Sequence, residues 1–208
     1  MKLYGHPIST CTRKALMLLE ERHAKADFVL VDLMKGEHKG PAHLERQPFG
    51  QIPVLEDGDL RLYESRAILR YLDETLPGAA LTPRDPKGRA MMEQWISVET
   101  SNFTPHAMGI LYELMFGPMM RGTQPDMAKV EESSAKLANT ADILDKQLAQ
   151  GPHLLGDSFS LADICYMPYI EYVVQTSAKD VLLSRPNVAA WWGRISGRPS
   201  WQKAIGKG

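Results

Sequence analysis

A segment rich in proline and glycine divides the chain into two stretches with different hydrophobic periods. The segment carries its chain-breaking residues at Pro77, Gly78, Pro83 and Pro86. Neither a helix nor a strand interior tolerates such a cluster. Short apolar runs precede it, whereas apolar residues recur every three or four positions after it. We therefore predict an α/β domain at residues 1–76, a linker at 77–86 and an all-helical domain at 87–208.

Composition excludes several classes of protein. The chain of 208 residues is 44% hydrophobic and 24% charged, and it lacks the run of about 20 apolar residues that a membrane helix needs. Its start lacks the apolar core of a secretory signal, so we expect a cytoplasmic protein. A net charge of -1 argues against a general nucleic-acid or anionic-membrane surface. Two distant cysteines without a ligand pattern predict neither disulfides nor a metal site.

The first 76 residues have the pattern β-α-β, then a loop, then β-β-α. We predict strands at 2–4, 28–32, 54–56 and 60–63, helices at 12–21 and 65–76, and a loop at 34–40. The Asp57-Gly58 dipeptide favours an antiparallel hairpin between the last two strands. In the second domain we predict helices at 87–116, 127–148, 160–177, 186–196 and from Pro199 onward.

Ile52-Pro53 opens the hairpin strand. A proline there removes one ladder donor and can turn the preceding backbone outward, which leaves the Ile52 N–H and C=O available to an extended ligand. Gln51 could supply an amide to the same ligand. The alternative is an ordinary trans proline that begins a strand.

Two groups of polar residues could bind carboxylates. Ser65 and the first amides of its helix form an anion site, and Glu64 could pair with an ammonium group, so the two fit the head of an α-amino acid. His38 and Lys39 offer donors for a second carboxylate. An ordinary helix cap and a solvated loop are the simpler interpretations.

Ser9 lies at the entry of the first helix, where its hydroxyl could donate to a thiolate. A free thiol has a pKa near 8.5. Lowering that pKa by about two units requires roughly 2.7 kcal/mol of stabilisation of the thiolate relative to the thiol. One hydrogen bond to a charged acceptor supplies roughly 1.5–3 kcal/mol. A single hydroxyl, helped by the helix N-terminus, is therefore sufficient. A plain helix cap is the alternative role.

Cys11 is the competing reactive group, because the same helix dipole could acidify its thiol and allow a mixed disulfide. The alternative is a small buried apolar side chain. Farther on, Ser160 and Asp163 form a capping pair at the start of a buried helix, which concerns folding rather than chemistry.

The order of these features resembles the glutathione S-transferases over essentially the whole chain. The motifs closest to the phi class are Gly5-His6-Pro7-Ile8-Ser9, Gly36-Glu37-His38-Lys39, Pro48-Phe49-Gly50-Gln51-Ile52-Pro53 and Glu64-Ser65-Arg66-Ala67-Ile68. Cys11 departs from that class, which usually carries a small inert residue at this position, whereas bacterial beta-class members carry a cysteine close to this point. The flanking residues fit phi better.

The resemblance implies the fold of the cytosolic glutathione S-transferases, with a thioredoxin-like domain and an all-helical domain. It also implies a cis Ile52-Pro53 bond and a homodimer. It implies that the Ile52 backbone pairs with the cysteinyl part of glutathione, while Glu64 and Ser65 hold its γ-glutamyl head. His38, Lys39 and Gln51 would serve the glycyl end, and Ser9 would stabilise the thiolate. Pro53 belongs to the same glutathione-binding set.

We therefore expect a transferase that ionises glutathione and adds the thiolate to small hydrophobic electrophiles, with a glutathione-dependent peroxidase side activity. The expected apolar pocket comprises Ile8, Cys11, Met34, Phe103, His106, Ile110, Met115, Phe116 and Tyr169. Two alternatives stay open: a Cys11-dependent thiol transferase or disulfide reductase, and a non-catalytic module for ligand binding or assembly.

Overall fold

The computed structural model of the protein describes residues 1–207, which divide into two compact units. One unit comprises Met1–Ala80 together with the residues from Arg198 on, and the other comprises Leu81–Gly197. None of the helices in the described residues combines the length and apolar character needed to cross a membrane.

A four-stranded mixed sheet forms the centre of the first unit. Its strands are β1 (Lys2–Gly5), β2 (Asp27–Leu30), β3 (Val54–Asp57) and β4 (Leu60–Tyr63), in the order β2-β1-β3-β4. β1 is parallel to β2 and antiparallel to β3, which pairs antiparallel with β4. Gly58 in the hairpin has φ 61, a backbone conformation that glycine adopts without a steric cost. The predicted hairpin is confirmed.

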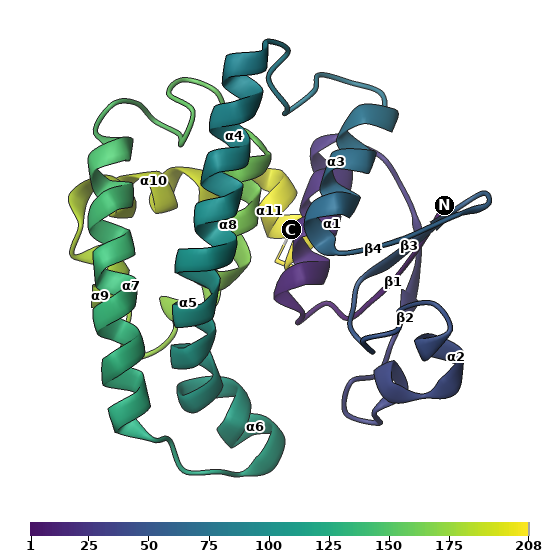
Figure 1. The fold of residues 1–208 in the computed structure, drawn as a ribbon, viewed down its shortest axis with the longest axis horizontal. Coiled ribbons are helices and arrows are strands. Elements are labelled where there is room, and N and C mark those ends of the chain that lie inside the picture. The colour runs from purple at the N-terminus through teal and green to yellow at the C-terminus, as the bar shows by residue number, and fades with distance from the viewer. Residues whose placement is uncertain (208) are drawn as a thin grey trace. The chain divides into compact units, whose positions relative to one another are not determined.

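Helices cover this sheet unequally. The longer helices α1 (Thr10–Glu21) and α3 (Ser65–Thr75) pack together on one side, whereas the short α2 (Pro41–Leu44) lies on the other (Figure 1). A 3-10 turn, η1 (Glu37–Lys39), precedes α2. The prediction of a plain loop at 34–40 missed this turn, because three residues are too short for a hydrophobic period to show.

The first unit is completed by the last helix, α11 (Pro199–Ala204), which packs against α1. Trp201 is fully buried there. Arg198 donates from Nε and Nη2 to the two carboxylate oxygens of Glu21, both at 2.8 Å. A bidentate pair of this kind fixes geometry as well as contributing energy. The residues from Arg198 on thus group with the sheet and not with the preceding helices.

The second unit is all-helical. Its elements are α4 (Pro86–Val98), η2 (Glu99–Phe103), α5 (Thr104–Leu111), η3 (Tyr112–Phe116), α6 (Gly117–Arg121), α7 (Met127–Leu148), α8 (Leu161–Val173), α9 (Asp180–Leu183) and α10 (Pro186–Ser196). The predicted helix at 87–116 is interrupted by η2 and η3, which are both π turns. Pro105 and Pro118 follow them at the second positions of α5 and α6. A proline lacks the N–H that the regular ladder requires, so a wider turn precedes each one.

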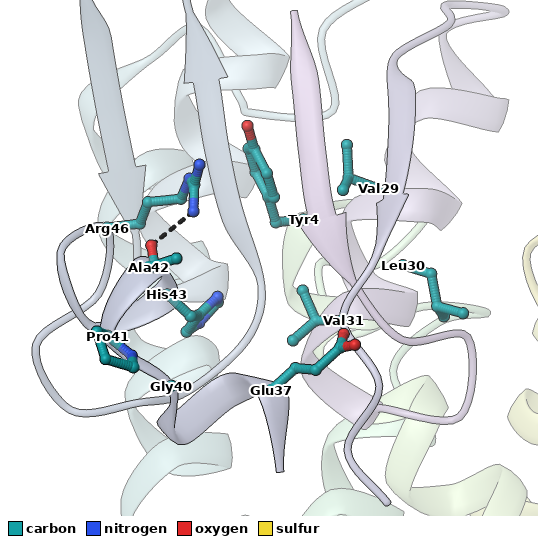
Figure 2. A pocket seen from close by; sticks show the side chains of 10 residues that line it. All are labelled: Tyr4, Val29, Leu30, Val31, Glu37, Gly40, Pro41, Ala42, His43 and Arg46. Carbon is teal, nitrogen blue, oxygen red and sulfur yellow. Dashed lines mark hydrogen bonds between the residues drawn. The ribbon is translucent and has the colours of Figure 1, made fainter. Parts of the chain in front are cut away.

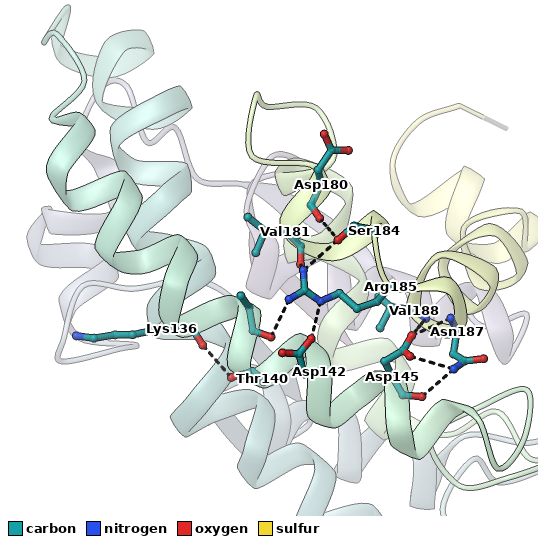
Figure 3. A network of polar contacts seen from close by, with 11 residues as sticks. Lys136, Thr140, Asp142, Asp145, Asp180, Val181, Ser184, Arg185, Asn187 and Val188 are labelled. Carbon is teal, nitrogen blue, oxygen red and sulfur yellow. Dashed lines mark hydrogen bonds and ion pairs between the residues drawn. The ribbon is translucent and has the colours of Figure 1, made fainter.

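Polar contacts tie α7 to the segment that contains α9 and α10 (Figure 3). The carboxylate of Asp145 on α7 accepts hydrogen bonds from the backbone N–H groups of Asn187 and Val188, at 2.8 and 3.1 Å, and so caps α10. Arg185 donates to Asp142 on α7 and to the Val181 carbonyl, both at 2.8 Å. These bonds satisfy helix-end groups that would otherwise lack partners.

Candidate functional site

A small pocket lies where the hairpin segment meets the beginning of α3. It has a volume of about 40 Å³ and is lined by Cys11, Gln47, Gln51, Ile52, Pro53, Glu64, Ser65 and Arg66. The structure therefore brings together most of the residues predicted to bind glutathione and adds Cys11 to them. The Ile52–Pro53 peptide bond is cis, as the resemblance implies.

The N-terminus of α3 is open on its pocket side. The side chain of Glu64, the residue before the helix, makes no capping hydrogen bond to it. Ser65 is only 3% exposed, yet its hydroxyl has no hydrogen bond to any other residue in the described part of the chain. Glu64 precedes it with φ 72 and ψ 108, and a non-glycine residue held there costs on the order of 1–3 kcal/mol. The N-terminal amides of a helix and its positive dipole can bind an anion at such a point.

Two buried side chains that sequence reasoning did not select hold the segment before Ile52. The Oε1 atom of Gln47 accepts from the Gln51 N–H at 3.0 Å, and the Nε2 atom of His43 lies 2.7 Å from the Gln51 carbonyl. Gln47 and His43 are 1% and 5% exposed. His43 lies on α2, which the sequence did not predict, so no local signal pointed to it.

His38 and Lys39 lie on η1. Lys39 donates from Nζ to the Phe49 carbonyl at 3.0 Å. A Cβ atom at Gly50, which has φ 60, would lie 2.8 Å from the His38 carbonyl oxygen, so only glycine fits under this turn. The buried Nδ1 atom of His38 has no hydrogen-bond partner among the described residues. Burial, and then the charges of Lys39 and His43, lower the pKa of His38.

Ser9 caps α1. Its Oγ atom accepts from the Thr12 N–H at 3.3 Å, which leaves the hydroxyl hydrogen to be donated elsewhere. Cys11 lies in the first turn of the same helix, is half-buried and forms no disulfide. Both candidate reactive groups are therefore on the first turn or cap of one helix, and Cys11 lines the pocket.

The residues expected to line an apolar substrate pocket differ in burial. In the first unit Ile8 is half-buried and Met34 is 64% exposed. In the second unit the residues that are nearly or fully buried are Phe103, Ile110 and Tyr169, and the half-buried ones are His106, Met115 and Phe116. Phe103 packs edge-on against Tyr166, with ring centres 4.9 Å apart, as a core residue does.

Ser160 and Asp163 form a closed cap at the start of α8. Asp163 is fully buried, and its Oδ2 atom accepts from both the N–H and the hydroxyl of Ser160 at 2.9 Å. Its Oδ1 atom accepts from Trp191 Nε1 at 3.0 Å and from the Leu154 N–H at 3.2 Å. All of these donors belong to the helical unit.

Sequence comparisons match this chain to one protein family over nearly its full length. Residues 1–74 match the model of the glutathione S-transferase N-terminal domain, and residues 103–199 match that of the C-terminal domain. Glutathione S-transferase PARB of Nicotiana tabacum is 41% identical over 100% of this chain and 98% of its own. Glutathione S-transferase F9 of Arabidopsis thaliana is 37% identical over 100% of this chain and 97% of its own.

Solved structures give the same result. Glutathione transferase F7 from Populus trichocarpa has a TM-score of 0.93 at 40% identity, over 98% of this chain and 96% of its own. Glutathione S-transferase I from maize, in complex with an atrazine glutathione conjugate, has a TM-score of 0.90 at 35% identity, over 98% of this chain and 95% of its own. The predicted fold, a thioredoxin-like domain followed by a helical domain, is confirmed.

Proposed function

The chain belongs to the glutathione S-transferase family, and we propose that it binds glutathione along the segment from Gln51 to Ser65, ionises the thiol and adds it to small hydrophobic electrophiles. The observation that carries this proposal is the uncapped start of α3. The Glu64 side chain does not cap this helix, the Ser65 hydroxyl has no hydrogen bond within the described residues, and both residues line a pocket with Ile52. A γ-glutamyl carboxylate supplies the missing acceptor, and Glu64 supplies a counter-charge for the ammonium group.

The remaining contacts follow from peptide geometry. The cysteinyl part of glutathione pairs with the Ile52 backbone, which Gln47 and His43 position through Gln51. Pro53 keeps that backbone turned toward the ligand. His38, Lys39 and Gln51 serve the glycyl carboxylate, whose charge would give His38 Nδ1 the partner that it lacks.

Ser9 acts on the thiol. Since its oxygen already accepts the Thr12 N–H, its hydrogen is directed to a thiolate, which a hydrogen bond stabilises over the neutral thiol. We restrict the electrophile contacts proposed in the helical unit to His106, Met115 and Phe116, because these side chains keep exposed surface. Ile8, Cys11 and Met34 are the proposed contacts in the first unit.

The test compares turnover of an aryl halide by Ser9→Ala, Ser9→Thr and Cys11→Ala. Loss of one charge-assisted hydrogen bond predicts that Ser9→Ala lowers kcat/KM by about 10- to 150-fold. Ser9→Thr retains a hydroxyl and should recover most of the activity, while Cys11→Ala should stay within a few-fold of the parent. Intact turnover in Ser9→Ala together with inactive Cys11→Ala would reverse the assignment.

A second activity is favoured by the presence of Cys11 in the pocket wall. Its thiolate could attack a glutathione mixed disulfide, forming a Cys11–glutathione disulfide and releasing the other thiol as thiolate. A second glutathione thiolate would then restore Cys11 and release glutathione disulfide. Mass spectrometry that detects a glutathione adduct on Cys11, absent in Cys11→Ser, tests this thiol-transferase activity.

The bound state of glutathione distinguishes both activities from simple binding. An enzyme that ionises glutathione gains the ultraviolet absorbance of a thiolate on binding, whereas a non-catalytic module binds without that gain. We further propose that the protein is a cytoplasmic homodimer without nucleic-acid or membrane partners. Sedimentation equilibrium of the intact chain would show twice the chain mass if the dimer forms.

A further inference from the structure

A second cavity of about 420 Å³ opens on the α2 side of the sheet in the first unit. Its walls are formed by Tyr4, Val29, Leu30 and Val31 on one side and by residues of the segment from Glu37 to Arg46 on the other (Figure 2). The cavity shares no lining residue with the pocket at α3. Its volume is in the range of about 300–1,000 Å³ that is typical of small-molecule sites.

The floor of the cavity is apolar. Tyr4 and Val31 are 9% and 5% exposed and belong to one buried cluster, against which Val29 packs. Leu30 is 56% exposed at the rim. Such a surface favours the apolar body of a ligand, since each Å² of apolar area removed from water contributes about 25 cal/mol.

Arg46 gives the cavity a cationic end. Its guanidinium lies 4.7 Å above the Tyr4 ring, and Nη1 donates to the Ala42 carbonyl at 2.6 Å. Nε is buried without a hydrogen-bond partner, and Nη2 has none within residues 1–207. The nearest carboxylate is that of Glu56, with Oε1 3.5 Å from Nε. Tyr4 and Arg61 already donate to Glu56, so the charge of Arg46 is only partly compensated.

Glu37 gives the cavity an anionic end. Figure 2 shows its carboxylate and the Arg46 guanidinium on opposite sides of the group of lining residues. Oε2 of Glu37 accepts from the Asp32 N–H at 2.7 Å, which fixes the side chain at the rim. A negative charge at this end repels a second negative charge on a ligand.

We propose that this cavity binds a small organic monoanion, with its carboxylate on Arg46 and its apolar body against Tyr4, Val29 and Val31. An anion can accept hydrogen bonds from the Arg46 donors that have no protein acceptor. An alcohol of the same shape gains less binding energy from these hydrogen bonds. Because of Glu37, the site prefers ligands with one negative charge over ligands with two.

The test uses calorimetric titration of the intact protein, without glutathione, with 4-phenylbutanoate and 4-phenylbutan-1-ol. The carboxylate should bind at least about tenfold more tightly, because hydrogen bonds to charged groups exceed neutral ones. Arg46→Met should reduce its affinity to that of the alcohol. Ala42→Phe keeps the guanidinium but fills the space, and it should abolish binding of both compounds.

Arg194→Met is the matched control, because Arg194 also donates from Nη1 to one backbone carbonyl, that of Pro152, at 2.7 Å. It should leave binding unchanged, and so should Ser65→Ala. Glu37→Gln should improve binding of 4-(4-carboxyphenyl)butanoate, a dianion, by about two- to fivefold. Absence of 4-phenylbutanoate binding, or binding that survives both Arg46→Met and Ala42→Phe with circular dichroism unchanged, would overturn the proposal.

Discussion

Ser65 is the first residue of α3 and Ser160 directly precedes α8, and each lies close in sequence to a carboxylate, yet the two helix starts are satisfied in different ways. At α8, Asp163 accepts from Ser160, Leu154 and Trp191, so the helix end is closed by the protein. At α3, the Ser65 hydroxyl donates to no described residue, and the Glu64 side chain does not cap the helix. The same residue types therefore close a helix end in one unit, whereas in the other they form the binding site that we propose.

The difference teaches how to distinguish a structural cap from a binding site. A cap is identified by donors that are already used inside the protein, and a site by buried donors whose partners are missing. Backbone strain agrees with this distinction, because Glu64 before α3 has φ 72 whereas Ser160 before α8 is extended.

The largest expected effect follows from opening the closed cap. Asp163→Ala should lower the free energy of unfolding by about 3–5 kcal/mol, because several buried donors lose their acceptor at once. Urea unfolding followed by circular dichroism measures this loss. Asp163→Asn keeps an acceptor oxygen and should cost less. A loss below about 1 kcal/mol in Asp163→Ala would show that the cap is not closed in the way described.

A paired substitution separates the two roles of serine. Ser65→Ala should weaken glutathione binding by about 10- to 150-fold and change the free energy of unfolding by less than about 0.5 kcal/mol. Ser160→Ala should cost about 1 kcal/mol of stability and leave the affinity unchanged. Calorimetric titration and urea unfolding of both variants provide the comparison, and similar losses of stability in the two would remove the distinction.

Strain at the open helix end gives the next effect. Glu64→Gly should raise the free energy of unfolding by about 1 kcal/mol, because relief of a φ of 72 outweighs the flexibility that glycine adds to the unfolded chain. The same change should weaken glutathione binding through loss of the carboxylate. Glu74→Gly, in the last turn of α3, is the matched control and should destabilise the helix. A destabilised Glu64→Gly would contradict the strain argument.

The smallest expected effect concerns protons. Burial lowers the pKa of His38 below its usual value near 6.5, and a bound glycyl carboxylate should raise it again. Binding should then take up part of a proton, and affinity should increase as the pH falls through the bound-state pKa. Calorimetry of S-methylglutathione at about pH 6, in two buffers that differ in ionisation enthalpy, measures the uptake. In His38→Gln it should vanish; uptake that persists would assign the proton to another group.

Local sequence patterns were sufficient for much of the fold. The helical period predicts α7 and α10 with the bounds that the structure has, and the Asp57-Gly58 dipeptide predicts the hairpin. The segment from Gln51 to Ser65 could be proposed as one candidate binding stretch because a proline, a turn and a helix start lie close together in sequence.

The features that could not be predicted from the sequence depend on contacts between residues that are far apart in the sequence. The support of Gln51 by His43, the burial of Phe103 against Tyr166 and the capping of α10 by Asp145 each join segments that no period connects. The π turns before Pro105 and Pro118 were missed because apolar spacing continues across them. Their signal was present in the prolines, which bar a regular helical ladder.

The pairing of Arg198 with Glu21 has a consequence for synthesis. The sheet and α1 leave the ribosome early, but α11, which buries Trp201 beside them, is translated only after the whole helical unit. Domains generally fold in the order in which they emerge. Here the earliest segment remains incomplete until α11 has been translated, so we expect glutathione binding to be acquired only after the helical unit has been synthesised.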